Sequence, residues 1–180
     1  MSTANIITIS RILFVPVFLY FLVNISSANY DWISAVLFLL ISLTDFLDGY
    51  VARKYKQVTN FGKFLDPLAD KILIVSALVV LVSLGRMSAI TTVVIIAREF
   101  MVTSIRLVAS GEGTVISASL FGKLKTISQI VAVTAVLLEK YLIMIYPLPY
   151  AAFFTWIMLI LTIYSGIEYA VVNRKLIHFE

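Results

Sequence analysis

The sequence predicts an all-α integral membrane protein in which six transmembrane helices follow a short N-terminal interfacial segment. Of its 180 residues, 61% are hydrophobic and 13% are charged, whereas soluble domains are about half apolar and about a quarter charged. The apolar residues fall in successive runs of about 20, the length that an α-helix needs to cross a bilayer. Because no linker, repeat or polar domain interrupts these runs, residues 1–180 are expected to form a single six-helix membrane domain.

The first nine residues are expected to form the interfacial segment. Asn5, Thr8 and Ser10 are residue types that cap or begin a helix. Arg11 follows them and can keep its charge at the level of the lipid headgroups. We therefore expect the first span to begin at about residue 10.

The first span is expected at residues 10–24. It contains Pro16, which a membrane helix tolerates because neighbouring groups satisfy the freed carbonyl. The apolar run 12–23 behind Arg11 also fits a signal peptide, with the small residues at 26–28 as its cleavage site. A single positive charge and the closely spaced spans that follow favour an uncleaved helix.

Turn residues separate the remaining spans. An uncharged link at 25–30 precedes the second span, and a Gly-Arg pair at 85–86 makes a tight turn between the third and the fourth. A polar stretch at 111–114 leads into the fifth span, and prolines within 147–149 mark the turn before the sixth. The spans are expected at residues 31–53, 66–84, 88–110, 123–144 and 150–172.

Lysine and arginine residues are distributed unevenly about these spans. With a cytoplasmic N-terminus, eleven of them fall on the inner side, against Arg86 and Lys140 on the outer side and Arg98 within the fourth span. The eleven are Arg11, Arg53, Lys54, Lys56, Lys63, Lys71, Arg106, Lys123, Lys125, Arg174 and Lys175. This bias follows the positive-inside rule. We expect a multi-pass protein of the cell inner or plasma membrane with both termini cytoplasmic.

Four of the five aspartates lie close together, at the ends of two expected spans. Asp45 and Asp48 are three residues apart, so they share one helical face. Gly62, Asp66 and Asp70 recur every four residues, which again gives one face. An antiparallel pair of helices would therefore bring the four carboxylates together.

Four adjacent carboxylates need a counter-charge to remain ionised. The chain has no cysteine, and oxygen-only ligands suit hard cations such as Mg²⁺ or Mn²⁺. Gly49 and Ala52 follow one turn after the aspartates and leave space for a ligand against the helix. Arg53 can add a bidentate contact to phosphate. The pattern predicts a site for divalent metal and a diphosphate.

The spaced pattern D-x₂-D-G-x₂-A-R-x₈-G-x₃-D-x₃-D resembles the signature of the CDP-alcohol phosphotransferase family. All eight fixed positions are present: Asp45, Asp48, Gly49, Ala52, Arg53, Gly62, Asp66 and Asp70. If each residue type occurs at roughly one position in fifteen, a chance match is on the order of 10⁻⁹ per starting position. The six-helix membrane fold of that family would cover essentially the whole chain.

The resemblance implies a reaction at the cytoplasmic side of the membrane. A CDP-linked lipid binds with its diphosphate on one or two Mg²⁺ or Mn²⁺ ions, an alcohol attacks the β-phosphorus and CMP leaves. The implied metal ligands are Asp45, Asp48, Asp66 and Asp70, of which Asp70 is also the candidate base for the acceptor hydroxyl. The implied CDP-binding residues are Asp48, Gly49, Ala52, Arg53, Gly62 and Asp66. The resemblance also implies a homodimer.

A second polar cluster concerns the acceptor alcohol. On a helix, Glu99, Thr103 and Arg106 fall on one stripe, with Arg98 roughly 80° from Arg106. The strings R-E-F-x-V-T-x-x-R and G-K-x-K-T resemble those of the phosphatidylglycerophosphate synthase branch, whose acceptor is sn-glycerol 3-phosphate. The residues expected to bind the acceptor phosphate are Arg98, Arg106, Lys123 and Lys125.

Several alternatives remain open at this stage. Inositol phosphate would use similar cations, serine or phosphatidylglycerol are other acceptors of the family, and the basic residues also serve the positive-inside rule. A small carboxylate-dependent transporter is the alternative outside enzymes. Asn5, Thr8 and Arg11 resemble a family string, N-x-x-T-x-x-R, that would contact the lipid diphosphate, although capping and interface anchoring explain them equally well.

Overall fold

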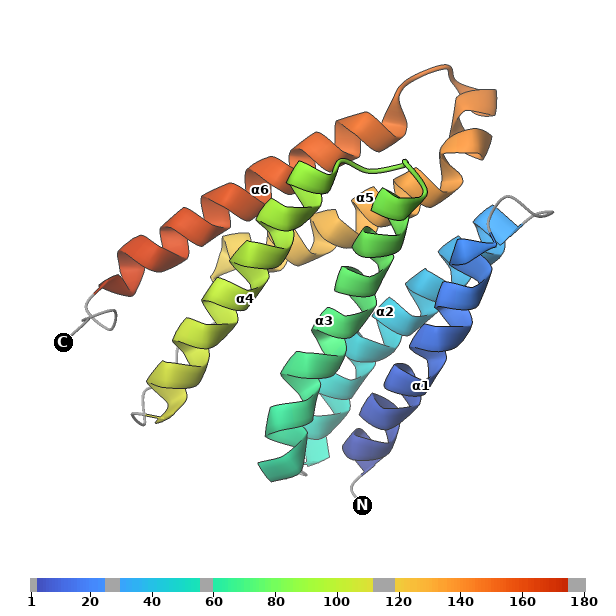
Figure 1. The fold of residues 1–180 in the computed structure, drawn as a ribbon. Coiled ribbons are helices and arrows are strands. Elements are labelled where there is room, and N and C mark those ends of the chain that lie inside the picture. Colours follow the sequence, from blue (N-terminus) through green and yellow to red (C-terminus); the bar gives the residue numbers. More distant parts are fainter. Residues whose placement is uncertain (1–2, 25–29, 56–59, 112–118, 175–180) are drawn as a thin grey trace.

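The computed structural model describes residues 3–24, 30–55, 60–111 and 119–174, and within 3–9, 45–55 and 60–70 and at 110 it describes the backbone without the side chains. In these ranges the chain folds into helices and turns without a strand, which confirms the all-α class. Figure 1 shows six helices: α1 (Thr3–Val23), α2 (Tyr30–Tyr55), α3 (Asn60–Ser83), α4 (Ala89–Gly111), α5 (Leu120–Ile145) and α6 (Tyr150–Val172).

Residues 1–9 were expected to form an interfacial segment before a span at residues 10–24, and the first helix begins within that segment. Helix α1 begins at Thr3 and continues without interruption to Val23, passing through Pro16. Serine, threonine and asparagine cap helices, but a helical serine or threonine can also hydrogen-bond to the carbonyl one turn before it. The cap-forming residues within 3–10 therefore do not stop the helix.

The other expected spans agree with the helices, with one larger difference. Helix α6 has the expected bounds, whereas α3 begins at Asn60, six residues before the span expected at 66–84. The expectation followed the apolar run, but a helix does not have to end where its sequence becomes polar. The additional residues place Gly62 on the same helix as Asp66 and Asp70.

Successive helices run in opposite directions (Figure 1). The start of α1, the end of α2, the start of α3, the end of α4, the start of α5 and the end of α6 therefore lie toward the same end of the bundle. The turns at 84–88 and 146–149 lie at the other end. This alternation is what six spans with both termini on one side require.

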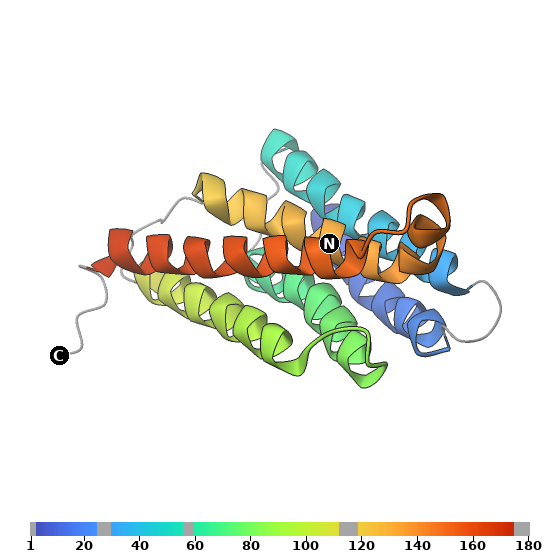
Figure 2. The ribbon, with the colours of Figure 1, turned by 90° about the horizontal axis from the view of Figure 1, so that it is seen from above.

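The helices pack as two groups. Helix α1 contacts α2 and α3, while α6 contacts α4 and α5, and in Figure 2 α6 runs across the bundle with α4 and α5 on its two sides. Contacts between α2 and α5 and between α3 and α4 join the groups. Phe18 of α1 and Phe38 of α2 are fully buried where these two helices meet, with ring centroids 5.7 Å apart. In lipid such rings stabilise the bundle by close packing rather than by removal from water.

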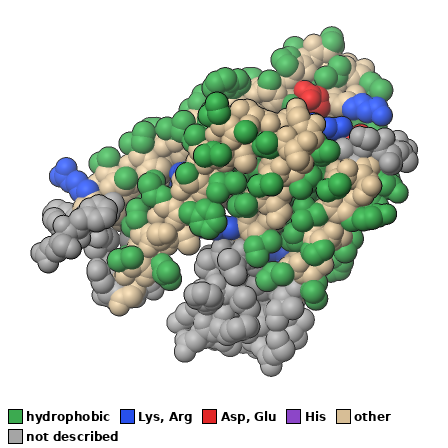
Figure 3. Space-filling view, viewed as in Figure 1, with side chains coloured by type: hydrophobic (Ala, Val, Ile, Leu, Met, Phe, Trp, Pro, Cys, Tyr) green, Lys and Arg blue, Asp and Glu red, His purple; other side chains and the backbone are tan. Residues whose placement is uncertain are grey.

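The outer surface carries many large apolar side chains. Leu13, Ile90 and Trp156 are each more than 60% exposed, and Figure 3 shows hydrophobic side chains over much of the described part of one face. Soluble proteins rarely expose apolar surface on this scale. Among the described residues, α5 and α6 are long and apolar enough to cross a membrane. These features support the expected membrane protein.

Candidate active site

The four clustered aspartates all lie on helical backbone. Asp45 and Asp48 belong to α2, and Asp66 and Asp70 belong to α3. The two segments are consecutive antiparallel helices, and α2 and α3 are in contact. The helical spacing on which the metal prediction depends is therefore present. Their side chains lie outside the described residues, so metal binding by these aspartates stays a prediction.

The expected nucleotide and lipid contacts lie on the same helices and on α1. Residues Gly49, Ala52 and Arg53 belong to α2, and Gly62 belongs to α3. The structure describes only the backbone of these residues, so their contacts stay predictions. The same holds for the side chains of Asn5 and Thr8 in α1.

Arg11 is described in full. It lies in α1, which packs against α2 and α3, and only 3% of its surface is exposed. Arginine is rarely buried unless its charge is paired inside the protein. The burial of Arg11 therefore favours an internal contact over anchoring at the membrane surface. Its expected contact with the lipid diphosphate stays a prediction.

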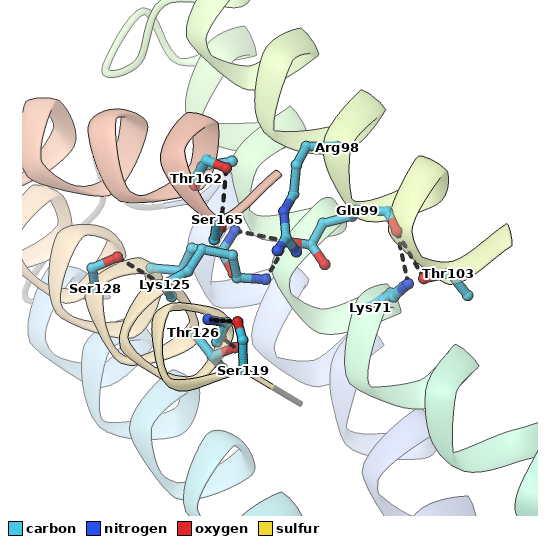
Figure 4. A network of polar contacts seen from close by, with 12 residues as sticks. Lys71, Arg98, Glu99, Thr103, Ser119, Lys125, Thr126, Ser128, Thr162 and Ser165 are labelled. Atoms are coloured by element: carbon cyan, nitrogen blue, oxygen red, sulfur yellow. Dashed lines mark hydrogen bonds and ion pairs between the residues drawn. The ribbon is translucent and has the colours of Figure 1, made fainter. Parts of the chain in front are cut away.

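The second expected cluster forms a buried polar network between α3, α4 and α5 (Figure 4). On α4, Glu99 occupies the buried stripe that includes Thr92, Ile95 and Val102, at the spacing of an α-helix. On α5, Lys125 begins the buried stripe. A carboxylate and an ammonium group thus occupy positions that apolar side chains would otherwise fill.

The Glu99 carboxylate is the acceptor at the centre of this network. Its Oε1 accepts hydrogen bonds from the Lys125 ammonium and from Gln129 Nε2, the latter at 3.3 Å. Arg98 Nη1 lies 3.6 Å from the same oxygen. The side chains of Glu99 and Lys125 are 11% and 6% exposed, so the carboxylate and the ammonium compensate each other away from water.

The backbone of Glu99 makes a further connection, to α3. Its carbonyl oxygen accepts a hydrogen bond from Lys71 Nζ at 3.0 Å and another from Thr103 Oγ1 at 2.7 Å. The second contact confirms that Glu99 and Thr103 lie on one face of α4. Since Lys71 follows Asp70 directly, the first contact fixes the aspartate-bearing part of α3 against α4.

Arg98 extends from α4 toward α6 (Figure 4). A Cβ atom added to Gly166 of α6 would lie 3.1 Å from Arg98 Cγ, closer than ordinary contact allows. The absence of a side chain at Gly166 is therefore what lets α6 approach Arg98. Arg98 Nε is buried and has no hydrogen-bond partner among the described residues, so the guanidinium group keeps donor capacity.

We expect Gly166→Ala to give no gain in the free energy of unfolding, although alanine is favoured over glycine in a helix interior by about 1 kcal/mol. The added Cβ must displace Arg98, which offsets the helix preference. Gly166→Leu should lower the unfolding temperature. Gly111→Ala in α4 is the matched control, since nothing lies within 4 Å of its added Cβ. Thermal unfolding in detergent tests this, and a stabilising Gly166→Ala would contradict the contact.

Arg106 and Lys123 are exposed, unlike Arg98 and Lys125. They lie toward the end of the bundle where α4 ends and α5 begins. The guanidinium carbon of Arg106 lies 5.5 Å from the centre of the Tyr169 ring, a cation–π contact that orients it. The four cations expected to bind one phosphate thus divide into an exposed pair and a pair whose side chains are at most 10% exposed.

The first turn of α5, which carries Lys123, is held at its N-cap. Ser119 Oγ accepts a hydrogen bond from the backbone nitrogen of Gly122 at 3.1 Å and donates to Glu168 Oε2 of α6 at 2.8 Å. This hydrogen bond connects Glu168 of α6 to the start of α5. The cap stabilises the helix turn on which Lys123 lies.

Four residues of the site were not predicted from the sequence: Lys71, Gln129, Gly166 and Tyr169. Gln129 follows Lys125 by one helical turn, so the pair could have been found from the helical spacing. Gly166 belongs to a group of small buried residues in α6, which also marks a close helix contact. The partners of Lys71 and Tyr169 depend on the distances between helices, which no spacing within one helix reveals.

Helices α2 and α3 carry the spaced aspartates and α4 and α5 carry the cations, which is the arrangement that the motif predicts for a membrane transferase. The chain belongs to the CDP-alcohol phosphatidyltransferase family, whose model matches residues 1–164. The matched residues include the aspartates and the cations of α4 and α5. Gly166 and Tyr169 lie beyond them.

Within the family, the chain is similar to proteins named CDP-diacylglycerol–glycerol-3-phosphate 3-phosphatidyltransferase. It is 42% identical over 180 residues to that of Bacillus subtilis (strain 168), with 92% of this chain and 91% of the relative covered. It is 39% identical over 173 residues to that of Rickettsia felis, with 95% and 94% covered. It is 37% identical over 175 residues to that of Haemophilus influenzae, with 93% and 91% covered.

Proposed function

We propose that this protein transfers the phosphatidyl group of CDP-diacylglycerol to sn-glycerol 3-phosphate, giving phosphatidylglycerophosphate and CMP. The acceptor hydroxyl oxygen forms a bond to the β-phosphorus, the bond from that phosphorus to the CMP oxygen breaks, and the hydroxyl proton is taken up by a base. The observation that carries the proposal is the eight-position motif on α2 and α3 beside the cations of α4 and α5. The relatives' names agree with it.

The residues on α2 and α3 suit a divalent metal. Asp45, Asp48, Asp66 and Asp70 offer oxygen donors on helical backbone, as Mg²⁺ or Mn²⁺ requires, and divalent metal ions are general in this family. One or two bound ions supply positive charge to the diphosphate. Asp70 also accepts the proton of the attacking hydroxyl.

The nucleotide lies against the small residues of the same helices. Gly49, Ala52 and Gly62 let the cytidine part approach the backbone, and Arg53 forms a bidentate contact to phosphate. Asn5, Thr8 and Arg11 contact the lipid diphosphate from α1.

The cations of α4 and α5 hold the acceptor. Arg106 and Lys123 are exposed and therefore reachable by a water-soluble phosphate, whose charge they match. Arg98, with its remaining donor, and Lys125 lie behind them. Glycerol 3-phosphate is cytosolic, so the site faces the cytoplasm with both termini, as the charge bias indicates. CDP-diacylglycerol enters from the inner leaflet, and the protein acts as a homodimer.

CMP release tests this function directly. We expect the purified protein with CDP-diacylglycerol and Mg²⁺ to release CMP only when glycerol 3-phosphate is added, because its phosphate matches the cations of α4 and α5. Serine, inositol phosphate and phosphatidylglycerol are the parallel acceptors. A preference for any of these would contradict the assigned acceptor, and the absence of CMP release with every acceptor would favour a transporter.

A further inference from the structure

Glu99 is the one residue in the described network that joins three helices. Its carboxylate accepts a hydrogen bond from Lys125 of α5, and its backbone carbonyl accepts one from Lys71 of α3. Glu99 itself belongs to α4, which is the third attachment. Each of these attachments lies near a proposed functional residue. Lys125 is two residues from Lys123, and Lys71 is one residue from Asp70.

The third attachment connects Glu99 to Arg106 along α4. The two residues are seven positions apart, about two helical turns, so they lie on the same side of the helix. A shift of Glu99 relative to α3 or α5 would therefore move the exposed acceptor cations relative to the aspartates. Misplacement of a reacting group by about 1 Å can cost about 10²-fold in rate.

The cavity that the described side chains leave beside the Glu99–Lys125 pair is too small for the acceptor. A cavity of about 20 Å³ is bordered by Lys71, Glu99, Lys125 and neighbouring side chains of α3 and α5. That volume admits about one water molecule. This cavity does not admit a phosphate group beside the Lys125 ammonium, which donates a hydrogen bond to Glu99.

We propose that Glu99 is a positioning residue for the acceptor site and that Lys125 acts through Glu99 rather than by contacting the acceptor phosphate. The inference rests on the proposed function. It separates Lys125 from the two exposed cations: Arg106 and Lys123 bind the phosphate, while Lys125 neutralises the buried carboxylate that sets the distance between α3, α4 and α5.

The buried pair makes the proposal testable, because removal of one partner takes the nearest described counter-charge from the other. Glu99→Gln removes the carboxylate beside the Lys125 ammonium, and Lys125→Met leaves Arg98 as the described cation nearest to the Glu99 carboxylate, whereas the double variant removes both charges of the pair. Loss of one partner of a buried pair is costly, but replacement of both is often neutral. A residue that binds phosphate directly would behave differently, since no second substitution can restore its contact.

The experiment is steady-state CMP release in detergent–lipid micelles by the full chain and the three variants. We expect Glu99→Gln and Lys125→Met each to raise the KM for glycerol 3-phosphate about tenfold or more, with the KM for CDP-diacylglycerol changed less than about twofold. The double variant should return the acceptor KM to within about threefold of the wild type. Unfolding temperatures are measured in parallel.

Three results would overturn the proposal. An unchanged acceptor KM in Glu99→Gln would remove the positioning role, and a double variant as impaired as Lys125→Met would make Lys125 a phosphate ligand. If the single variants do not fold, the double variant is measured alone. A folded double variant whose KM for glycerol 3-phosphate is raised about tenfold would contradict the proposal. A wild-type protein that ignores glycerol 3-phosphate overturns the proposed function itself, which separates the two failures.

Discussion

Asp66→Asn is expected to lower CMP release from CDP-diacylglycerol by about a thousandfold or more while the protein stays folded. Asparagine keeps the shape of the side chain but removes the negative charge with which a carboxylate strengthens the binding of a divalent cation. The loss of a proposed metal ligand therefore removes the charge that the ion supplies to the diphosphate. Asp45→Asn, on the facing helix, should have the same effect. Turnover is measured as CMP release at saturating glycerol 3-phosphate.

Asp31→Asn is the matched control. Asp31 is the aspartate outside the cluster, buried near the start of α2, where it accepts a hydrogen bond from Arg86 Nη1 at 2.9 Å. Arg86 lies in the turn between α3 and α4, at the end of the bundle opposite the clustered aspartates. This substitution breaks a buried ion pair, so it should lower the unfolding temperature and leave turnover within a few-fold.

Chelation gives the second arm of the same test. Excess EDTA should abolish CMP release by the wild type, and added Mg²⁺ or Mn²⁺ should restore it. Full turnover by Asp66→Asn, or by the chelated wild type, would contradict the metal assignment. A loss of turnover in Asp31→Asn as deep as in Asp66→Asn would show that the assay reports folding rather than metal binding.

Much of the fold was predictable because apolar runs of membrane length rarely have another interpretation. The bounds of α6 agree with its run, since a proline turn marks its start. The early start of α3 was not predictable from hydropathy, because Asn60 and the next five residues are helical without being apolar enough for a span. Hydropathy predicts which residues cross the bilayer, but a helix can continue past the edge of the bilayer.

The candidate site was predictable only within single helices. The 100° rotation per residue places Glu99 and Thr103 on one face, and the Thr103 hydroxyl does donate to the Glu99 carbonyl. The pairing of Glu99 with Lys125 was missed because it depends on how closely α4 and α5 pack. Lys125 was grouped with Lys123 by charge, yet a rotation of about 200° between them leaves one buried and the other exposed.

Asp70→Asn is expected to lower kcat by about 10²- to 10⁴-fold, the usual contribution of a general base. Lys71 Nζ donates to the Glu99 carbonyl, so the α3 residue next to Asp70 is fixed against the helix that carries Arg106. This places the backbone of Asp70 beside the proposed acceptor helix, where a base for the acceptor hydroxyl is required. Rapid-quench single-turnover rates with bound CDP-diacylglycerol measure the chemical step.

The binding of CDP-diacylglycerol separates a base from an essential metal ligand at Asp70. If Asp70 acts mainly as a base, Asp70→Asn should bind the lipid nucleotide within about tenfold of the wild type, whereas Asp66→Asn should bind it far more weakly. Asp70→Glu keeps a carboxylate and should recover part of the rate. Equal loss of binding in Asp66→Asn and Asp70→Asn would make Asp70 a metal ligand first, and an undiminished single-turnover rate would place the base elsewhere. The hydrogen bond from Lys71 to Glu99 fixes the neighbouring Asp70 near α4 whether Asp70 acts as a base or as a metal ligand. The rate of the chemical step is therefore the measurement that assigns the proton transfer.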